Sequence, residues 1–342
     1  MAEALLTREA AESGDVARRQ LDLNTETIAR LADRLRAERP RFVSTCARGS
    51  SDHATLYGKY LIERWLGLPV ASLGPSLASV YGSEPDLSGS LFIAASQSGR
   101  SPDALRLTEA AKRGRALVVA IVNDEASPLA ALADVVLPLH AGPERSVAAT
   151  KSFLGTCFAL LHLAAAWSDD AELLDAVRRG PALLDEAGGC DWGPELLSLR
   201  DAANLFVIGR GLGLGVAQEM ALKFKETCRI HAEAFSAAEV KHGPMALAGP
   251  GFPALVLDPA DEGSASTCAI AETLVSLGAE VRYAGFASGC PGRPLPLPPA
   301  APAALAPLIQ ARAFYGGIAA LAVARGLDPD NPPHLRKVTQ TL

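Results

Sequence analysis

A run of serines around one glycine, Ser-Gln-Ser-Gly-Arg-Ser at residues 96–101, is the stretch of this chain best suited to hold an anion. It follows an apolar segment typical of a strand and leads into a predicted helix that opens with Pro102. Backbone N–H groups at a helix start attract an anion, and serine hydroxyls can donate hydrogen bonds to phosphate oxygens. Gly99 allows the backbone to approach such a ligand closely. A plain turn would have the same composition, so this loop alone leaves both interpretations open.

A second loop of the same kind, Gly-Ser-Ser at residues 49–51, follows the preceding predicted strand. In an open α/β sheet, ligands bind at the loops that follow the carboxyl ends of neighbouring strands. The two loops together therefore favour a phosphate-binding site.

Three ionisable residues, Glu219, Lys223 and Glu226, are spaced i, i+4, i+7 along a predicted helix. At about 100° per residue their side chains fall within an arc of roughly 60°. Such a stripe is usually a solvated face. The residues that follow favour chemistry instead, because His242 stands beside Gly-Pro in a predicted loop, where it can reach a ligand.

Apolar runs alternate with helix-like segments, which favours an α/β fold with parallel sheets. Pairing Arg48-Gly49 with Arg210-Gly211 also places Ser96 level with Asp258, and this correspondence predicts an internal duplication with its boundary in residues 180–194. We expect strands at 41–46, 90–95, 116–122, 134–139, 204–208, 254–258 and 280–284, and helices at 53–65, 102–113, 148–167, 216–229 and 307–325.

Composition narrows the class of protein. Hydrophobic residues make up 49% and charged residues 20%, as in a globular protein, and the net charge of −6 leaves no basic footprint for nucleic acid or a membrane surface. Neither a signal peptide nor a membrane span is expected, which favours the cytoplasm. The six cysteines lie far apart without metal-ligand spacing, so we expect no zinc site, no disulfide framework and a reducing compartment.

Seven motifs, in this order, resemble the sugar isomerase (SIS) family. They are Arg48-Gly49-Ser50-Ser51-Asp52-His53-Ala54, Ser96-Gln97-Ser98-Gly99, Val147-Ala148-Ala149-Thr150-Lys151, Ala221-Leu222-Lys223-Phe224-Lys225-Glu226, His231-Ala232-Glu233-Ala234, Lys241-His242-Gly243-Pro244 and Pro333-His334-Leu335-Arg336-Lys337-Val338-Thr339. Nearly the whole chain is similar to the isomerase half of glucosamine-6-phosphate synthase, and more closely to the stand-alone SIS-type glucosamine-6-phosphate deaminases.

The resemblance implies two tandem SIS domains, each a parallel sheet flanked by helices in a flavodoxin-like three-layer αβα arrangement. We expect a helical extension at 1–24, a first SIS domain with the phosphate loops at 25–180, a second with the catalytic helix at 195–327, and an active-site tail at 328–342.

The resemblance also implies roles for individual residues. Glu226 would move a proton between C1 and C2, with Lys223 and Glu219 lining the same site. His242 would open the sugar ring in the site of the partner subunit of a homodimer, and Lys337 would engage the ketose carbonyl as a Schiff base. The sugar phosphate would be held by Gly49, Ser50, Ser51, Ser96, Gln97, Ser98, Ser101 and Val147. A carboxylate, an imidazole and an amine suit these three kinds of step.

The expected reaction is hydrolytic deamination of glucosamine 6-phosphate to fructose 6-phosphate and ammonium, with no cofactor and no metal. The alternatives are an aldose–ketose phosphosugar isomerase, a deglycase acting on a related amine-sugar phosphate, and a sugar-phosphate-binding regulator without catalysis. The chain begins Met1-Ala2, without the Cys that opens the synthase's glutaminase half, so glutamine-dependent synthesis is not expected. A dinucleotide enzyme is disfavoured because the glycines at residues 209–215 are spaced G-x-G-x-G-x-G rather than G-x-G-x-x-G.

Overall fold

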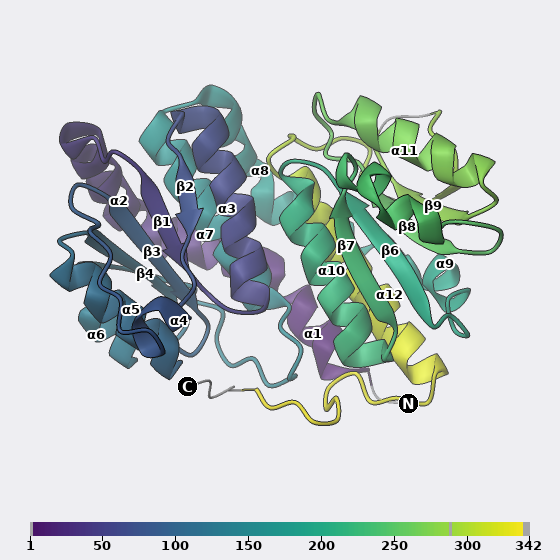
Figure 1. Cartoon of the computed structure of the whole chain (residues 1–342), viewed down its shortest axis with the longest axis horizontal. Helices are drawn as coiled ribbons and strands as arrows, with labels where there is room; N and C mark the ends of the chain where they lie inside the picture. Colours follow the sequence, from purple (N-terminus) through teal and green to yellow (C-terminus); the bar gives the residue numbers. More distant parts are fainter. Residues whose placement is uncertain (1–2, 287–288, 338–342) are drawn as a thin grey trace. The chain divides into compact units, whose positions relative to one another are not determined.

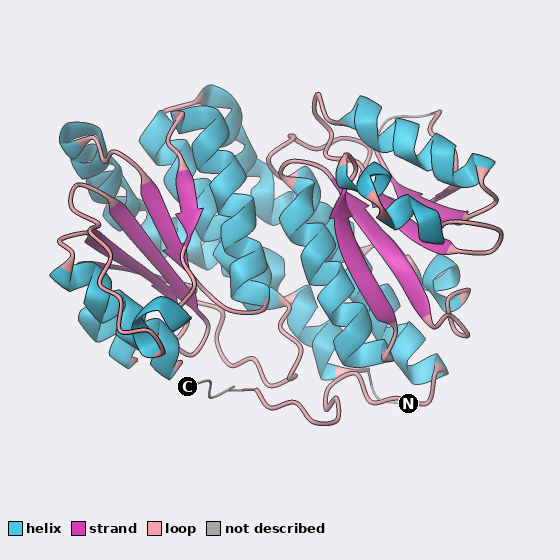
Figure 2. Cartoon of the chain, viewed as in Figure 1, coloured by secondary structure: helices cyan, strands magenta, loops and turns pink. Residues whose placement is uncertain are grey.

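The computed structural model describes residues 3–286 and 289–337, which form two compact units, each built around one sheet. The sheet A unit comprises residues 15–144, 151–178 and the tail from 336, and the sheet B unit comprises the chain up to residue 14, residues 145–150 and residues 179–335. Both units alternate strands and helices (Figures 1 and 2).

Sheet A has five parallel strands in the order β2-β1-β3-β4-β5. The strands are β1 (Val43–Cys46), β2 (Val70–Ser72), β3 (Leu91–Ser96), β4 (Leu117–Val122) and β5 (Val135–Pro138). The helices of this unit are α2 (Ser13–Glu38), α3 (Ser50–Leu66), α4 (Ser76–Ser79), α5 (Pro102–Arg113), α6 (Pro128–Leu132) and α7 (Lys151–Ser168).

The core of this unit lies on both faces of the sheet because alternate strand residues point to opposite sides. Ile93 and Val119 pack with apolar residues of α2, α3 and α7. Phe92 and Val118 pack with residues of α5 and α6. A parallel sheet covered on both faces requires continuous apolar strands, and the fully buried Leu-Val-Val-Ala-Ile-Val of β4 meets that requirement.

Sheet B is also parallel, in the order β10-β9-β8-β6-β7. Its strands are β6 (Asn204–Gly209), β7 (His231–Ser236), β8 (Pro253–Leu257), β9 (Glu280–Ala284) and β10 (Arg293–Pro294). Its helices are α1 (Leu5–Ala11), α8 (Ala171–Gly188), α9 (Gly193–Leu197), α10 (Gly213–Cys228), α11 (Ser264–Ser276) and α12 (Ala306–Ala324), with short 3₁₀ turns η1 (Glu239–His242) and η2 (Pro244–Leu247). Numbered within its own unit, each sheet has the order 2-1-3-4-5, so the expected two α/β halves are confirmed.

One face of sheet B is covered by α11 and the other by α10 and α12 (Figure 1). Phe224 of α10 meets Phe314 of α12 edge to face, with ring centroids 5.3 Å apart. Among the described residues α12 is the one helix long and apolar enough to cross a membrane, but 83% of its apolar window is buried in the protein, as in the core helix of a globular domain.

Helix α1 is joined to the far end of the chain inside the sheet B unit. It contacts α12, and the Asp330 carboxylate accepts hydrogen bonds from the backbone N–H groups of Leu5 and Leu6 at 2.8 and 2.7 Å. An acidic group at this end offsets the unpaired N–H groups that open every helix.

Two features of local structure bear on the sequence analysis. Residues 231–236 form strand β7 at the edge of sheet B, where His231 and Glu233 point outward and Ala232 is buried. Within the stretch 180–194, where the boundary is expected, α8 continues through Pro181 to Gly188. The division between the two units falls next to this stretch, between residues 178 and 179.

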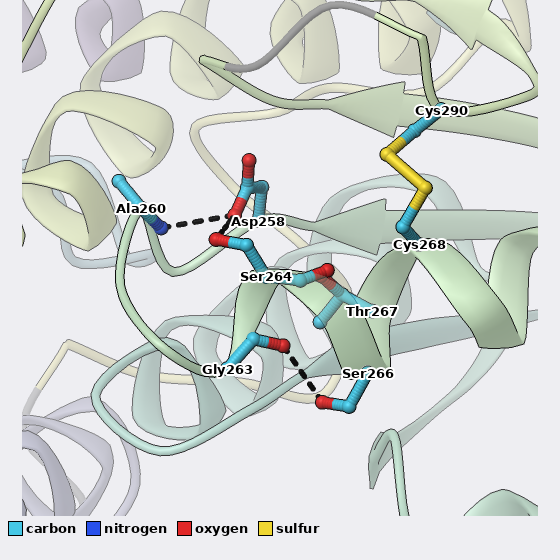
Figure 3. Close-up of a disulfide and its surroundings, with 8 residues drawn as sticks. All are labelled: Asp258, Ala260, Gly263, Ser264, Ser266, Thr267, Cys268 and Cys290. Atoms are coloured by element: carbon cyan, nitrogen blue, oxygen red, sulfur yellow. Dashed lines mark hydrogen bonds between the residues drawn. A yellow bond between two sulfur atoms is a disulfide. The ribbon is translucent and has the colours of Figure 1, made fainter.

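The expectation of no disulfide is wrong for one pair. Cys268 of α11 and Cys290 of the segment after β9 are bonded, with Cα atoms 5.3 Å apart (Figure 3). The spacing gave no signal because the helix and the segment meet only once sheet B has formed. The other described cysteines are free thiols, and burial, helped by Asp103, raises the pKa of Cys46 to about 12.

Replacing Cys268 with Ser should lower the stability of the oxidised protein by about 3 kcal/mol, because the bond closes a loop of 22 residues and limits the unfolded chain. Urea unfolding with and without reductant measures the effect. Cys190→Ser, at a free and partly exposed thiol, should change little. Six reactive thiols in the denatured, unreduced protein would contradict the bond.

Candidate functional site

The two predicted phosphate loops lie at the ends of adjacent strands in sheet A. Strands β1 and β3 pair in parallel, with Cys46 opposite Ala94, and the strand order reverses direction at this point. In open α/β sheets, ligands bind outside the carboxyl ends of the strands at this reversal. The loops that follow are residues 47–49 and 97–101, leading into α3 and α5.

Glycine is required where each loop turns. Gly49 and Gly99 have φ of +55° and +61°, in the left-handed region that L side chains rarely adopt. A Cβ at Gly99 would also lie 2.2 Å from Ser127 Oγ. Ser50 and Ser51 open α3, and Ser101 caps α5, so all three hydroxyl groups stand at helix N-termini.

Two hydroxyl oxygens of the β3 loop accept backbone hydrogen bonds. Ser96 Oγ accepts from Gly99 N at 3.1 Å, and Ser98 Oγ accepts from Arg100 N at 3.3 Å. Each hydroxyl then still has its own hydrogen to donate. The loop, with Gln97 between them, is suited to donate to an anion.

An ion pair joins the first loop to helix α5, which follows the second loop, and the sequence analysis missed it. The Arg48 guanidinium donates to Asp103 Oδ2 from Nε and Nη2 at 3.1 and 2.9 Å, and the Asp103 side chain is only 3% exposed. Ser101 Oγ donates to the other oxygen of Asp103 at 2.6 Å. In this structure the Ser101 hydroxyl therefore helps to fix the loop, in addition to the phosphate contact expected for it. Arg48 stood in a recognised motif, whereas Asp103 carried no signal beyond its place in the first turn of a helix.

In the sheet B unit, the stripe on α10 is a buried charge network rather than a solvated face. Lys223 Nζ lies 3.1 Å from Glu219 Oε1 and 2.6 Å from Glu226 Oε2. The side chains of Lys223 and Glu219 are fully buried, and that of Glu226 is 18% exposed. Burial opposes the charged amine, but the two carboxylates outweigh it and raise the pKa of Lys223. Lys223 is therefore a permanent cation that holds Glu226 in place.

Glu226 lies in the wall of a cavity of about 480 Å³. The other lining residues, all of this unit, are Leu222, Lys225, Arg229, Pro333, His334 and Leu335. A carboxyl group that is fixed by a lysine and open to a cavity can act as a general base.

The remaining predicted site residues lie outside the two serine loops and the α10 network. His242 ends η1 and is exposed, and Gly243 after it has φ of +138°. Val147 donates its backbone N–H to the carbonyl of Asp330 at 3.0 Å. Lys337 is ion-paired with Glu144 at 2.7 Å in the sheet A unit. Within residues 3–286 and 289–337, no three His, Cys, Asp or Glu side chains gather closely enough to hold a metal.

Comparisons with known proteins agree with this architecture. The family model described as the SIS domain matches residues 41–166 and 198–284. The glutamine–fructose-6-phosphate aminotransferase (isomerizing) of Aeropyrum pernix is 36% identical over 317 residues, covering 84% of this chain and 49% of that protein. The chain thus spans about half the length of the curated relatives it matches.

Solved structures show the same similarity. A protein from Silicibacter pomeroyi DSS-3, provisionally described as a phosphosugar isomerase, is 43% identical with a TM-score of 0.91, covering 96% of this chain and 100% of that one. The C-terminal domain of the glucosamine-fructose-6-phosphate aminotransferase from Francisella tularensis is 25% identical with a TM-score of 0.81, covering 97% and 99%.

Replacing Lys223 with Met should destabilise the protein by about 3–5 kcal/mol, because it removes the ammonium that is paired with the fully buried carboxylate of Glu219. Denaturant unfolding near neutral pH measures the loss. The control is Arg178→Met, which breaks an exposed pair with Asp175 and should cost no more than about 1 kcal/mol. Equal losses in the two variants would mean that the α10 network contributes no more than a surface pair.

Proposed function

The chain belongs to the SIS-domain family, and from that premise we propose that it is an amino-sugar phosphate deaminase converting glucosamine 6-phosphate and water into fructose 6-phosphate and ammonium. The observation that carries the proposal is the buried Glu219–Lys223–Glu226 network, which places the carboxyl group of Glu226 on a cavity. A protein that only binds a sugar phosphate has no use for a base prepared in this way. The network therefore favours catalysis over the regulator alternative.

Phosphate recognition is assigned to the loops of sheet A. Ser51, Ser96, Gln97 and Ser98 supply donors beside two helix N-termini, with Gly49 and Ser50 at the first of them. Helix N-termini favour an anion through their unpaired N–H groups and dipole. Hydrogen bonds to phosphate are made in both ground and transition states, so they provide affinity rather than rate.

The chemistry is a proton shift followed by hydrolysis. Ring opening, assigned to His242, exposes an aldehyde at C1 beside the amine at C2. Glu226 takes the proton from C2 and returns it to C1. A second proton passes from the amine nitrogen to the carbonyl oxygen of C1, so that C1 becomes an alcohol and C2 an imine. The Lys337 amine displaces ammonia from that carbon, and water then releases the ketose and restores the lysine. The overall reaction is balanced, because the amino sugar and one water give the ketose and one ammonia.

A second candidate is removal of a larger amine. The cavity beside Glu226 is far larger than ammonia needs, and its wall combines apolar Leu222, Pro333 and Leu335 with the guanidinium of Arg229. These groups suit an amine that carries a carboxylate and an apolar side chain. The alternative reaction is then the deglycation of a sugar phosphate bearing an amino acid.

A substrate panel decides between the candidates. The purified protein should release ammonium from glucosamine 6-phosphate without glutamine and form fructose 6-phosphate in equal amount. The same assay on amino-acid adducts of glucose and fructose 6-phosphate, read as free amino acid, tests the second candidate. A sugar-phosphate isomerisation with no amine release would contradict both.

Two variants should separate binding from chemistry. Ser98→Ala should raise KM about tenfold or more with little change in kcat, because it removes a donor to a charged phosphate. Glu226→Gln should lower kcat by about 10²–10⁴-fold, because the amide cannot take a proton. Ser266→Ala, at a serine of α11 that donates to Gly263, is the matched control and should leave both constants unchanged. If Ser98 governed kcat and Glu226 governed KM, the roles would be wrong.

A further inference from the structure

Glu144 is a buried carboxylate with an organised set of donors, and neither the sequence motifs nor the proposed reaction gives it a role. Its side chain is fully buried. Oε1 accepts from Ser152 N at 3.0 Å, and Oε2 accepts from Ser152 Oγ at 2.6 Å and from Lys337 Nζ at 2.7 Å. Ser152 stands in the first turn of α7, so the carboxylate also lies at a helix N-terminus, where a negative charge is favoured.

These donors keep Glu144 ionised in spite of its burial. Burial alone would raise the pKa of the carboxyl, but Lys337 and the hydrogen bonds from Ser152 outweigh it and leave the pKa below its ordinary value. The charged residues next to it in the chain are Arg145, which is exposed, and Lys151, which is buried at the start of α7. The Lys337 side chain, which is 22% exposed, is thus held by an ion pair to the buried carboxylate of Glu144.

We propose that Glu144 is a positioning residue that fixes the Lys337 side chain and serves as the counter-ion of its ammonium and of the protonated imine that Lys337 forms with the ketose carbonyl. The proposal rests on the function assigned to Lys337 above.

The charge balance of imine formation explains why a fixed anion is useful. The ammonium R–NH₃⁺ and the carbonyl O=C give R–NH⁺=C and one water: the C–O bond breaks, the C–N bond forms, and two protons leave with the oxygen. One positive charge stands on the nitrogen before and after the step. Glu144 therefore keeps a cationic partner throughout, and no uncompensated charge arises beside a buried carboxylate.

The same anion benefits the step that follows, in which water releases the ketose. A protonated imine has a more electrophilic carbon, so water attacks it more readily, and a carboxylate beside the nitrogen keeps the imine protonated. In the free protein the ion pair also holds the Lys337 amine away from other reagents. Removing the charge of Glu144 should thus make the lysine more reactive towards a reagent while turnover falls.

Competitive acetylation of the full chain measures the lysine directly. The rate at which Lys337 is acetylated at one fixed pH, read by mass spectrometry, should be severalfold higher in Glu144→Gln than in the unmodified protein, because the ion pair that holds the amine is gone. In the same variant kcat should fall about 10- to 100-fold, although the amine is more reactive towards the reagent. Glu63→Gln is the matched control, because Glu63 pairs with Lys59 in the same unit, and it should leave the acetylation rate of Lys337 and kcat unchanged. An unchanged acetylation rate, or a raised rate with undiminished kcat, would overturn the proposal.

A trapping experiment separates this proposal from the proposed function. Fructose 6-phosphate with cyanoborohydride should leave a sugar-phosphate adduct on Lys337 of the unmodified protein. Its absence would refute the function given to Lys337, whereas an adduct together with an unchanged acetylation rate in Glu144→Gln would refute only the role of Glu144.

A stability cycle covers the case in which Glu144→Gln folds poorly. Lys337→Met should lower the thermal midpoint, and the Lys337→Met, Glu144→Gln double variant should recover part of that loss. Additive losses would mean that the two groups do not form a pair and would overturn the proposal.

Discussion

The constraint on which the structure depends is that parallel strands present all their carboxyl ends at one edge of a sheet. Each strand must return to the start through a crossover, and the helices of these crossovers cover both faces. Sheet A meets the requirement with strands buried on both sides. Because β1 and β3 are neighbours in this parallel sheet, the serine loops that follow them lie at the same edge. The Arg48–Asp103 pair then fixes one loop to the helix that follows the other.

The turn after β8 in sheet B differs from the serine loop after β3 in the groups that it offers to an anion. Asp258 follows β8, at the position level with Ser96, and is almost fully buried. Its Oδ1 accepts from the backbone of Ala260 and from Ser264 Oγ (Figure 3). The Asp258 carboxylate occupies the inner side of the turn and accepts hydrogen bonds from donors that a phosphate would otherwise use. Its negative charge would also repel a phosphate. The buried charges of the sheet B unit lie instead in the network of α10.

The elements that could be predicted are those whose burial follows from a run of apolar residues. Strands such as β4 and the apolar helix α12 follow from runs of apolar residues, and the repeat of Arg-Gly after β1 and β6 indicated the duplication. The disulfide, the Arg48–Asp103 pair and the Lys337–Glu144 pair join residues distant in sequence, so no local pattern encodes them. The α10 stripe was recognisable by spacing, but only tertiary packing decides that Glu219 and Lys223 are buried.

The hydrogen bonds of Asp330 to the start of α1 bear on how the protein is made. The start of α1 is bonded to a residue 325 positions further along the chain, and α1 also packs on α12, so a ribosome delivers α1 long before its partners exist to receive it. Domains usually fold as they emerge, N-terminal part first. Here the nascent chain must carry α1, and later the uncovered side of α10 with Phe224, until α12 has been synthesised. The core of this unit can therefore close only after α12 emerges, and a chain cut short before α12 would be an aggregation-prone intermediate that depends on chaperones.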